Sequence, residues 1–185
     1  MVAKRKFKKV AKTKKPIIVS TGMASIEEIN DIITTAKAHG CPQLILLKCT
    51  STYPASAANT NLLTIPDMQQ RFDVEIGLSD HTLGIGVAVD SISLGVTVIE
   101  KHFTLSRQDG GVDSKFSMEP NEMKQLVIEC NNAFKALGCI TYSGTKEEQK
   151  SKQFRRSIFT SKAIKKGEIF SEKNIKIVRP GNGLK

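Results

Sequence analysis

The chain lacks any long apolar stretch. No apolar run approaches the ~20 residues that a membrane-spanning helix needs. Residues 1–15 also lack the apolar core of a secretory signal peptide. Both absences argue against membrane insertion and secretion, so we expect no membrane partner and a cytoplasmic protein.

Cysteine and aromatic residues are scarce. The four cysteines form no C-x-x-C pair, and they stand at Cys41, Cys49, Cys130 and Cys139. Their spacing disfavours a zinc site, and a chain of this length needs no disulfide framework, so we interpret them as reduced thiols. Tryptophan is absent, and aromatic residues make up 5% of the chain.

Acidic residues are unevenly distributed. Residues 1–15 carry eight basic residues and no acid, residues 16–149 hold nine basic and sixteen acidic residues, and residues 150–185 hold eleven basic and two acidic ones. One hypothesis is a non-catalytic half-barrel that binds nucleic acid or an acidic partner through its basic ends. We favour a solvated helix end and a tail that meets an anionic substrate, with no nucleic acid. The aromatic residues on which single-stranded nucleic acid stacks are rare in both ends.

Residues 16–140 repeat a pattern of strand followed by helix. Apolar, β-rich runs occur at 16–20, 44–47, 74–78 and 96–100, and helical patterns follow at 25–39, 62–68, 84–94 and 120–137. Ser25 and Glu28 have the spacing of a capping box. Four nearly continuous apolar strands that alternate with helices predict a parallel sheet in an α/β fold.

The architecture has two interpretations. The sheet is either an open four-stranded α/β sheet or half of a barrel, because a complete (β/α)8 barrel needs ~250 residues. Residues 7–15 have the pattern of the last turns of a helix, which favours the half-barrel. We expect 1–15 to be the basic end of a truncated helix, 16–140 the half-barrel, 141–157 a charged linker, and 158–185 part of a small β domain.

Two histidines follow the last two predicted strands. His81 lies in Ser79-Asp80-His81-Thr82, and His102 follows Glu100-Lys101. The carboxyl ends of parallel strands meet at one edge, where α/β barrels place their chemistry. Neutral imidazole is a common metal ligand, so the pair predicts a metal-assisted reaction.

Polar residues follow the other strands as well. Strand alternation places Ser79 on the face of His81, and Glu100 on the face of His102. The hydroxyls of Ser20, Ser51 and Ser79 suit the oxygens of a phosphate or carboxylate. Simpler interpretations remain open: Asp80 caps a helix, Glu100 pairs with a lysine across strands, Tyr53 only packs its loop, and a histidine at a strand end is structural.

Taken together, these motifs resemble the sialic acid synthase family, and within it the pseudaminic acid synthases. The resemblance covers nearly all of residues 8–185 and rests on residues 15–25, 47–54, 77–84, 99–105, 109–114 and 179–183. It implies the C-terminal half of a TIM (β/α)8 barrel, followed by a truncated antifreeze-like (SAF) β domain at 158–185.

The resemblance implies a transferase that condenses phosphoenolpyruvate with an N-acetylated amino sugar. The products are a nine-carbon acid, here pseudaminic acid, and phosphate; N-acetylneuraminate and legionaminate synthases are the alternatives. It implies that His81 and His102 bind Mn²⁺ or Mg²⁺. Glu100 joins these histidines as a catalytic residue, and the implied substrate contacts are Ser20, Ser51 and Ser79 for phosphoenolpyruvate and Tyr53 and Asp113 for the sugar.

The resemblance also implies a domain-swapped homodimer in which Arg179 reaches the partner's active site. The chain departs from the family pattern, however. The family's N-terminal half carries lysines for phosphoenolpyruvate and an acidic residue near the metal, and this sequence contains no counterpart. We therefore expect the isolated chain to bind metal weakly and to be inactive by itself.

Overall fold

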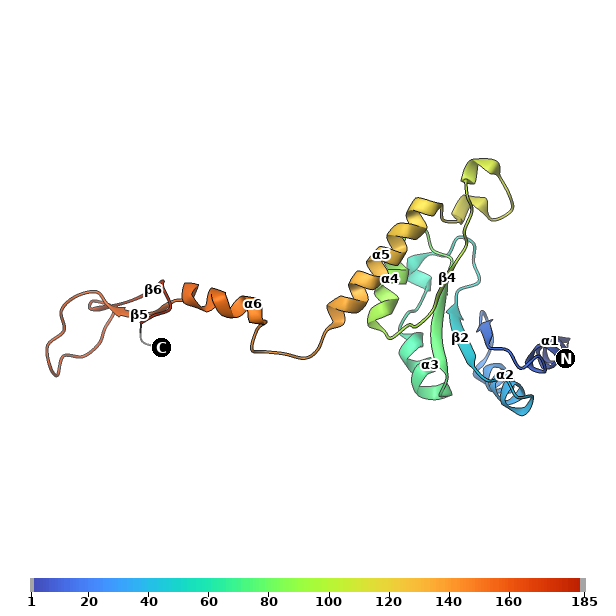
Figure 1. Ribbon diagram of the computed structural model, residues 1–185, viewed down its shortest axis with the longest axis horizontal. Helices are drawn as coiled ribbons and strands as arrows, with labels where there is room; N and C mark the ends of the chain where they lie inside the picture. Colours follow the sequence, from blue (N-terminus) through green and yellow to red (C-terminus); the bar gives the residue numbers. More distant parts are fainter. Residues whose placement is uncertain (1, 184–185) are drawn as a thin grey trace. The chain divides into compact units, whose positions relative to one another are not determined.

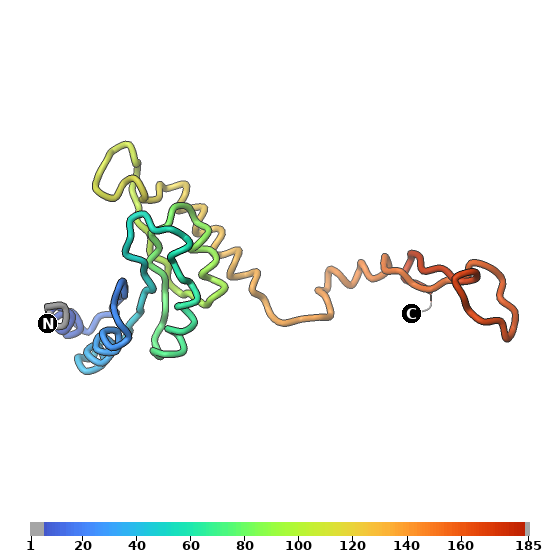
Figure 2. Tube along the Cα trace, turned by 180° about the vertical axis from the view of Figure 1, so that it is seen from behind, coloured from blue at the N-terminus to red at the C-terminus, as the bar shows by residue number. Residues whose placement is uncertain are grey.

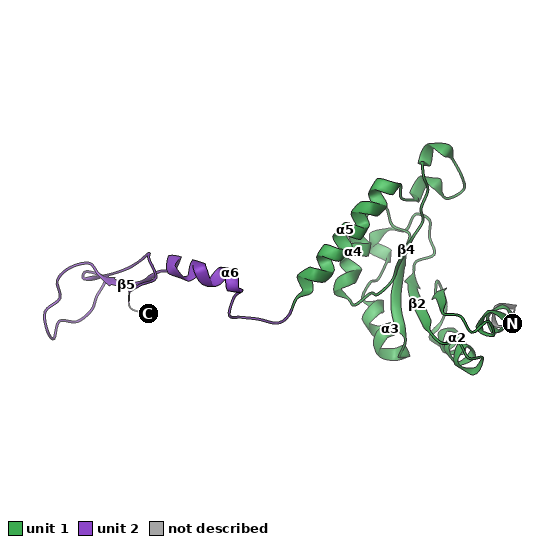
Figure 3. Cartoon of the chain, in the orientation of Figure 1, with its two compact units in different colours: residues 1–138 green, residues 139–185 purple. Residues whose placement is uncertain are grey.

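The computed structural model describes residues 2–183, with side chains from residue 6 onward. The chain divides into two compact units that meet between residues 138 and 139 (Figure 3). Within the described residues, no helix combines the length and the apolar character that crossing a membrane requires.

The first unit alternates strands and helices, as the sequence pattern predicts. Its elements are α1 (Val2–Ala11), β1 (Ile17–Ser20), α2 (Ile26–Ala38), β2 (Leu44–Cys49), η1 (Ala57–Asn59), α3 (Thr64–Phe72), β3 (Glu75–Asp80), α4 (Gly86–Ser93), β4 (Ile99–Lys101), η2 (Arg107–Asp109), η3 (Ser114–Phe116) and α5 (Pro120–Leu137). The four strands form a parallel sheet in the order β1-β2-β3-β4. In Figure 1, α3, α4 and α5 lie on the same flank of β4.

The apolar core lies between the sheet and its helices. Its buried residues come from α2, β2, α3, β3 and the segment before β4: Ile29, Ile33, Leu46, Ile65, Met68, Phe72, Ile76, Leu78 and Val96. A second cluster joins Ala88 of α4 to Leu126 of α5. Because strand side chains alternate, residues next to Leu46 and Leu78 in sequence point to the opposite face. We call that opposite side the open face.

Several boundaries differ from the sequence-based expectations. The helix predicted over 84–94 begins at Gly86, because Gly84 adopts φ +74°, which no α-helix accommodates. The helical segment expected over 7–15 ends at Ala11. The capping box of α2 is confirmed: the Glu28 N–H donates to Ser25 Oγ, and the Ser25 N–H donates to Glu28 Oε2 over 2.8 Å.

A long loop connects β4 to α5 and returns to its starting point. The Met118 N–H donates to the His102 carbonyl over 2.8 Å, and the Thr104 N–H donates to the Met118 carbonyl over 2.9 Å. Arg107 closes the loop, because its guanidinium Nη2 donates to Glu122 Oε1 of α5 over 3.0 Å. The middle of the loop projects beyond the sheet in both views (Figures 1 and 2).

The second unit is small and mostly irregular. It contains α6 (Lys146–Gln149), η4 (Lys150–Phe154) and an antiparallel pair of strands, β5 (Ser157–Thr160) and β6 (Ile175–Val178). The segment expected to be a charged linker, 141–157, therefore contains two short helices. The buried side chain of Asn174 organises the long β5–β6 connection, since its Nδ2 donates to Ile169 O and its Oδ1 accepts from Ser171 N.

Gly77 of β3 yields the first testable prediction. A Cβ atom at this position would lie 2.4 Å from Leu47 Cδ2 and 2.5 Å from the Val98 carbonyl oxygen. The second contact is with backbone, so relief requires β3 and the approach to β4 to separate. We expect Gly77→Ala to lower the free energy of unfolding by about 1–3 kcal/mol in a urea titration, as overpacking does.

Gly86→Ala is the matched control for this substitution. Gly86 is the first residue of α4, and nothing lies within 4 Å of the position of its Cβ. Alanine favours the helix, so we expect equal or higher stability. Equal stability of the two variants would contradict the close approach at Gly77.

Candidate functional site

The two histidines meet at the carboxyl edge of the sheet. His81 directly follows β3, and His102 directly follows β4. The strands are in register, with Ser79 opposite Glu100 and Asp80 opposite Lys101. The imidazole centroids lie 5.1 Å apart, with the rings edge to face. The sequence-based expectation that the two rings lie close together is therefore met.

The ring of His81 is oriented by the loop after β2. Its Nδ1 lies 2.8 Å from the Thr50 carbonyl oxygen. A carbonyl oxygen only accepts hydrogen bonds, so Nδ1 carries the proton and Nε2 of the neutral ring keeps its lone pair. A histidine that ligates a metal commonly makes this kind of second hydrogen bond.

Aromatic rings surround the histidine pair. The ring of Tyr53 lies 4.3 Å from that of His81, centroid to centroid, and 5.7 Å from that of His102. Phe116, from the β4–α5 loop, packs edge to face on His102 at 4.9 Å. Sequence reasoning missed Phe116, because only the return of that loop brings it next to the site.

A carboxylate and two hydroxyls lie together on the open face. The buried Ser79 hydroxyl donates to Glu100 Oε1 over 2.7 Å, and the Ser20 hydroxyl approaches the same oxygen at 3.4 Å. The alternative pairing of Glu100 with a lysine is wrong, because the carboxylate accepts from serine hydroxyls instead. The ends of β1, β3 and β4 thus present one polar group.

Ser51, in the loop after β2, lies beside the loop that follows β1. Gly22 adopts φ +51°, and a Cβ on it would lie 3.0 Å from Ser51 Oγ. Glycine relieves both the left-handed strain and the crowding, so the two loops run side by side. The Thr21 N–H and hydroxyl both donate to the Leu47 carbonyl over 2.9 Å, which fixes the first loop to β2.

Asp113 and Arg179 occupy different surroundings. Asp113 Oδ2 lies 3.6 Å from Nδ1 of His102, beyond hydrogen-bond distance but close enough to attract a protonated ring. The side chain of Asp113 is about half exposed to solvent. Arg179 lies in the second unit, directly after β6, and its side chain is exposed.

Charged side chains are buried on the helix side of the same strand ends. Lys101 Nζ lies 2.8 Å from Asp80 Oδ2, and the two side chains are 2% and 0% exposed. The alternative in which Asp80 caps α4 is wrong. The Asp80 carboxylate accepts hydrogen bonds from Lys101 Nζ and from the Thr82 N–H instead. Lys48 donates to Thr50 Oγ1 over 2.6 Å, and burial lowers the pKa of its amine despite attraction from Cys49 and Asp80.

The described side chains provide only part of a metal site. From residue 6 to residue 183, no three His, Cys, Asp or Glu side chains converge to hold an ion. His81 and His102 provide two imidazoles side by side, and Nδ1 of His81 bonds the Thr50 carbonyl oxygen. These donors suit a borderline cation whose remaining ligands are water and substrate oxygens.

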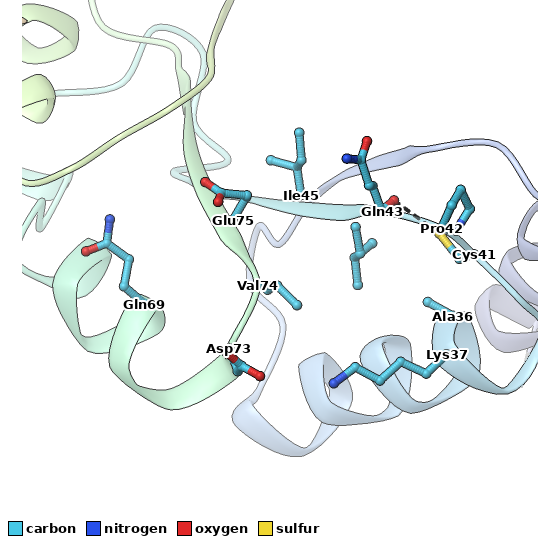
Figure 4. A pocket seen from close by; sticks show the side chains of 11 residues that line it. Ala36, Lys37, Cys41, Pro42, Gln43, Ile45, Gln69, Asp73, Val74 and Glu75 are labelled. Carbon is cyan, nitrogen blue, oxygen red and sulfur yellow. Dashed lines mark hydrogen bonds between the residues drawn. The ribbon is translucent and has the colours of Figure 1, made fainter.

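A cavity of about 600 Å³ opens at the opposite end of the sheet. It lies between α2 and α3, and Lys37 and Asp73 are among its lining residues (Figure 4). The Cys41 thiol, which also lines it, donates a hydrogen bond to the Gln43 carbonyl. Catalytic residues in α/β barrels lie at the carboxyl ends of the strands, and this cavity faces the amino ends. We therefore place the candidate site at the histidines.

Relatives with named functions are similar to this chain over nearly its whole length. The chain is 46% identical over 175 residues to a protein of Campylobacter jejuni named pseudaminic acid synthase, covering 95% of this chain and 51% of the relative. It is 42% identical to the N,N'-diacetyllegionaminic acid synthase of the same species, covering 96% and 54%. The chain thus spans about half the length of the curated relatives it matches.

A solved structure and a family profile agree with these relatives. The N-acetylneuraminic acid synthetase of Leptospira borgpetersenii, crystallised with citrate, superposes with a TM-score of 0.72 at 33% identity, over 80% of this chain and 51% of that protein. The parallel sheet is accordingly a curled half-barrel. The profile of the NeuB family matches residues 1–142. On these grounds, the chain belongs to the NeuB family.

Proposed function

We propose that this chain contributes the metal-binding half of a synthase active site. The enzyme condenses phosphoenolpyruvate with an N-acetylated amino sugar, giving a nine-carbon sialic-type acid and phosphate. The observation that carries the proposal is the contact between His81 and His102, 5.1 Å apart, beside the hydroxyls and carboxylate of the open face. Family membership supports the same chemistry.

Pseudaminic acid is the product that we propose. The Campylobacter jejuni relative with that name is 46% identical to this chain, and the N,N'-diacetyllegionaminic acid synthase of the same species is 42% identical. The margin is small, so N,N'-diacetyllegionaminate and N-acetylneuraminate are the alternatives. The side chains that would distinguish sugars lie above the histidines, and they include Tyr53, Asp113 and Phe116.

His81 and His102 are the proposed ligands of Mn²⁺ or Mg²⁺. Nε2 of His81 is available because Nδ1 is committed to Thr50. Ligation by His102 through either nitrogen leaves Asp113 close enough to balance the positive charge. A divalent ion held by these two imidazoles would supply Lewis acidity to the sugar aldehyde and would position water.

The remaining side chains orient the substrates. The hydroxyls of Ser20, Ser51 and Ser79 turn toward the phosphate and carboxylate oxygens of phosphoenolpyruvate. Its C3 attacks the aldehyde carbon, water adds at C2, and cleavage of the C–O bond releases phosphate. Glu100 is positioned to take the proton that the water loses, because its carboxylate already accepts hydrogen bonds at this edge.

The second unit corresponds to an antifreeze-like (SAF) domain in this proposal. The residues on which that resemblance rests, 179–183, directly follow β6 of the antiparallel β5–β6 pair. We propose that Arg179 meets the active site of a partner subunit in a domain-swapped homodimer. A guanidinium suits the phosphate or carboxylate of phosphoenolpyruvate.

Removing the imidazoles tests the metal site directly. We expect His81→Ala and His102→Ala each to weaken Mn²⁺ binding by the chain at least tenfold, because each removes a ligand. Free Mn²⁺ is counted by electron paramagnetic resonance. His39→Ala is the control, since its Nδ1 bonds Thr35 O at the end of α2. Equal affinity in all three variants would remove the histidines from the metal site.

A chimaera tests the reaction itself. The part of the Campylobacter jejuni pseudaminic acid synthase outside the matched region is fused ahead of this chain. We expect the chimaera to consume phosphoenolpyruvate, release phosphate and form a nine-carbon acid, identified by mass spectrometry with each candidate amino sugar.

The same chimaera with both histidines replaced by alanine is the inactive control, and the His39→Ala chimaera is the active one. A folded chimaera that binds Mn²⁺ but converts none of the amino sugars would overturn the proposed activity.

A further inference from the structure

We infer that the buried Lys101–Asp80 pair is a positioning device that fixes the orientation of His81. This inference rests on the proposed function, because it concerns the imidazole that would ligate the metal. Neither residue reaches the open face, and the family resemblance implied no role for either. Both lie one residue before a histidine, at the last pair of the β3–β4 register.

The buried Lys101–Asp80 pair contributes little net free energy to folding, because burial removes the hydration of both charges. Its side chains are 2% and 0% exposed, so both charges lose their hydration. A buried ion pair often stabilises a protein no more than apolar residues of the same volume would. Its presence at the ends of β3 and β4 therefore points to a role in fixing the local geometry.

The pair holds the backbone on the far side of His81. Lys101 Nζ donates to the Thr82 carbonyl oxygen over 2.8 Å, and Asp80 Oδ1 accepts from the Thr82 N–H over 2.9 Å. Both backbone groups of Thr82 are thus tied to the two buried charges. Thr82 is 3% exposed, and the turn through Asp80, His81 and Thr82 has no freedom to swing outward.

His81 is held by a second set of contacts on the β2 side. The Ala55 N–H donates to the His81 carbonyl over 2.9 Å, and the Nδ1–H of the ring donates to the Thr50 carbonyl over 2.8 Å. The bond at Nδ1 persists only while the turn stays in place. Release of Thr82 lets the ring rotate away from Thr50, and the neutral imidazole then samples both tautomers.

The same lysine connects the two histidines. Lys101 directly precedes His102 in the chain. Its ammonium group also donates hydrogen bonds to Asp80 and to Thr82, the two chain neighbours of His81. A shift of one strand end relative to the other would break these bonds. The pair therefore sets the distance between the two imidazoles as well as the tautomer of one.

Histidine-selective ¹⁵N NMR of the metal-free chain tests the inference, because the chain has three histidines. In the wild type we expect the His81 nitrogen shifts to report a single Nδ1–H tautomer. In Asp80→Asn/Lys101→Met, which removes both charges together, we expect a tautomer mixture. We also expect a dissociation constant for Mn²⁺ raised roughly 10–100-fold, the range found for groups that support metal ligands.

The Asp67→Asn/Arg71→Met variant is the matched control. That ion pair lies on the exposed surface of α3, with N···O 2.9 Å, and it touches neither histidine. We expect its spectrum and its Mn²⁺ affinity to equal those of the wild type. Asp80→Asn alone keeps the shape of the side chain and an acceptor for Thr82, and it provides the test where the double variant does not fold.

The outcomes separate this inference from the proposed function. A folded variant with an unchanged His81 tautomer and unchanged Mn²⁺ affinity would show that the pair is only structural. A wild-type chain that binds no Mn²⁺ contradicts the proposed function, and the tautomer in the metal-free chain still decides the positioning role.

Discussion

The register between β3 and β4 is the constraint on which the rest of the site depends. It sets Ser79 against Glu100 and Asp80 against Lys101, and each strand then delivers a histidine at the next position. The register itself depends on the close approach of β3 to its neighbours at Gly77. Leu47 and the Val98 carbonyl leave no room there for a side chain. One glycine thus lets the strands meet at the distance that brings two imidazoles together.

The alternation of strand side chains divides the work between two faces. On the open face, Ser79 donates to Glu100 and presents oxygen atoms to a ligand. On the helix face, one residue further along, Lys101 and Asp80 form a buried pair. The polar groups that we propose to meet substrate and those that hold the backbone are therefore adjacent in sequence and lie on opposite faces of the sheet.

The open face and the two edge strands of the half-barrel leave apolar and backbone groups that further residues can cover. Ile18 of β1 is 53% exposed on a sheet whose other side packs against helices. β1 and β4 are the edges of this sheet, with backbone groups that other strands can pair with. The relatives are about twice as long as this chain, which agrees with a surface that further residues cover.

Several features could be predicted from the sequence: the α/β pattern, the four parallel strands, the capping box of α2, the two histidines at strand ends and the family. These features are local: they follow from alternation, from spacing and from motifs that lie within a few residues of one another. Boundaries were less accurate, as at Gly84, because a backbone angle decides where α4 begins.

The contacts between side chains of the site could be seen only in the tertiary structure. Phe116 reaches His102 because a loop returns to its own start, and Glu100 accepts from serines of β1 and β3 rather than from a lysine. Lys101 pairs with Asp80 because the β3–β4 register places the two residues opposite each other on the buried face. Such contacts join residues that are far apart in sequence, so they are fixed by how strands pair and loops close, which a local pattern does not encode.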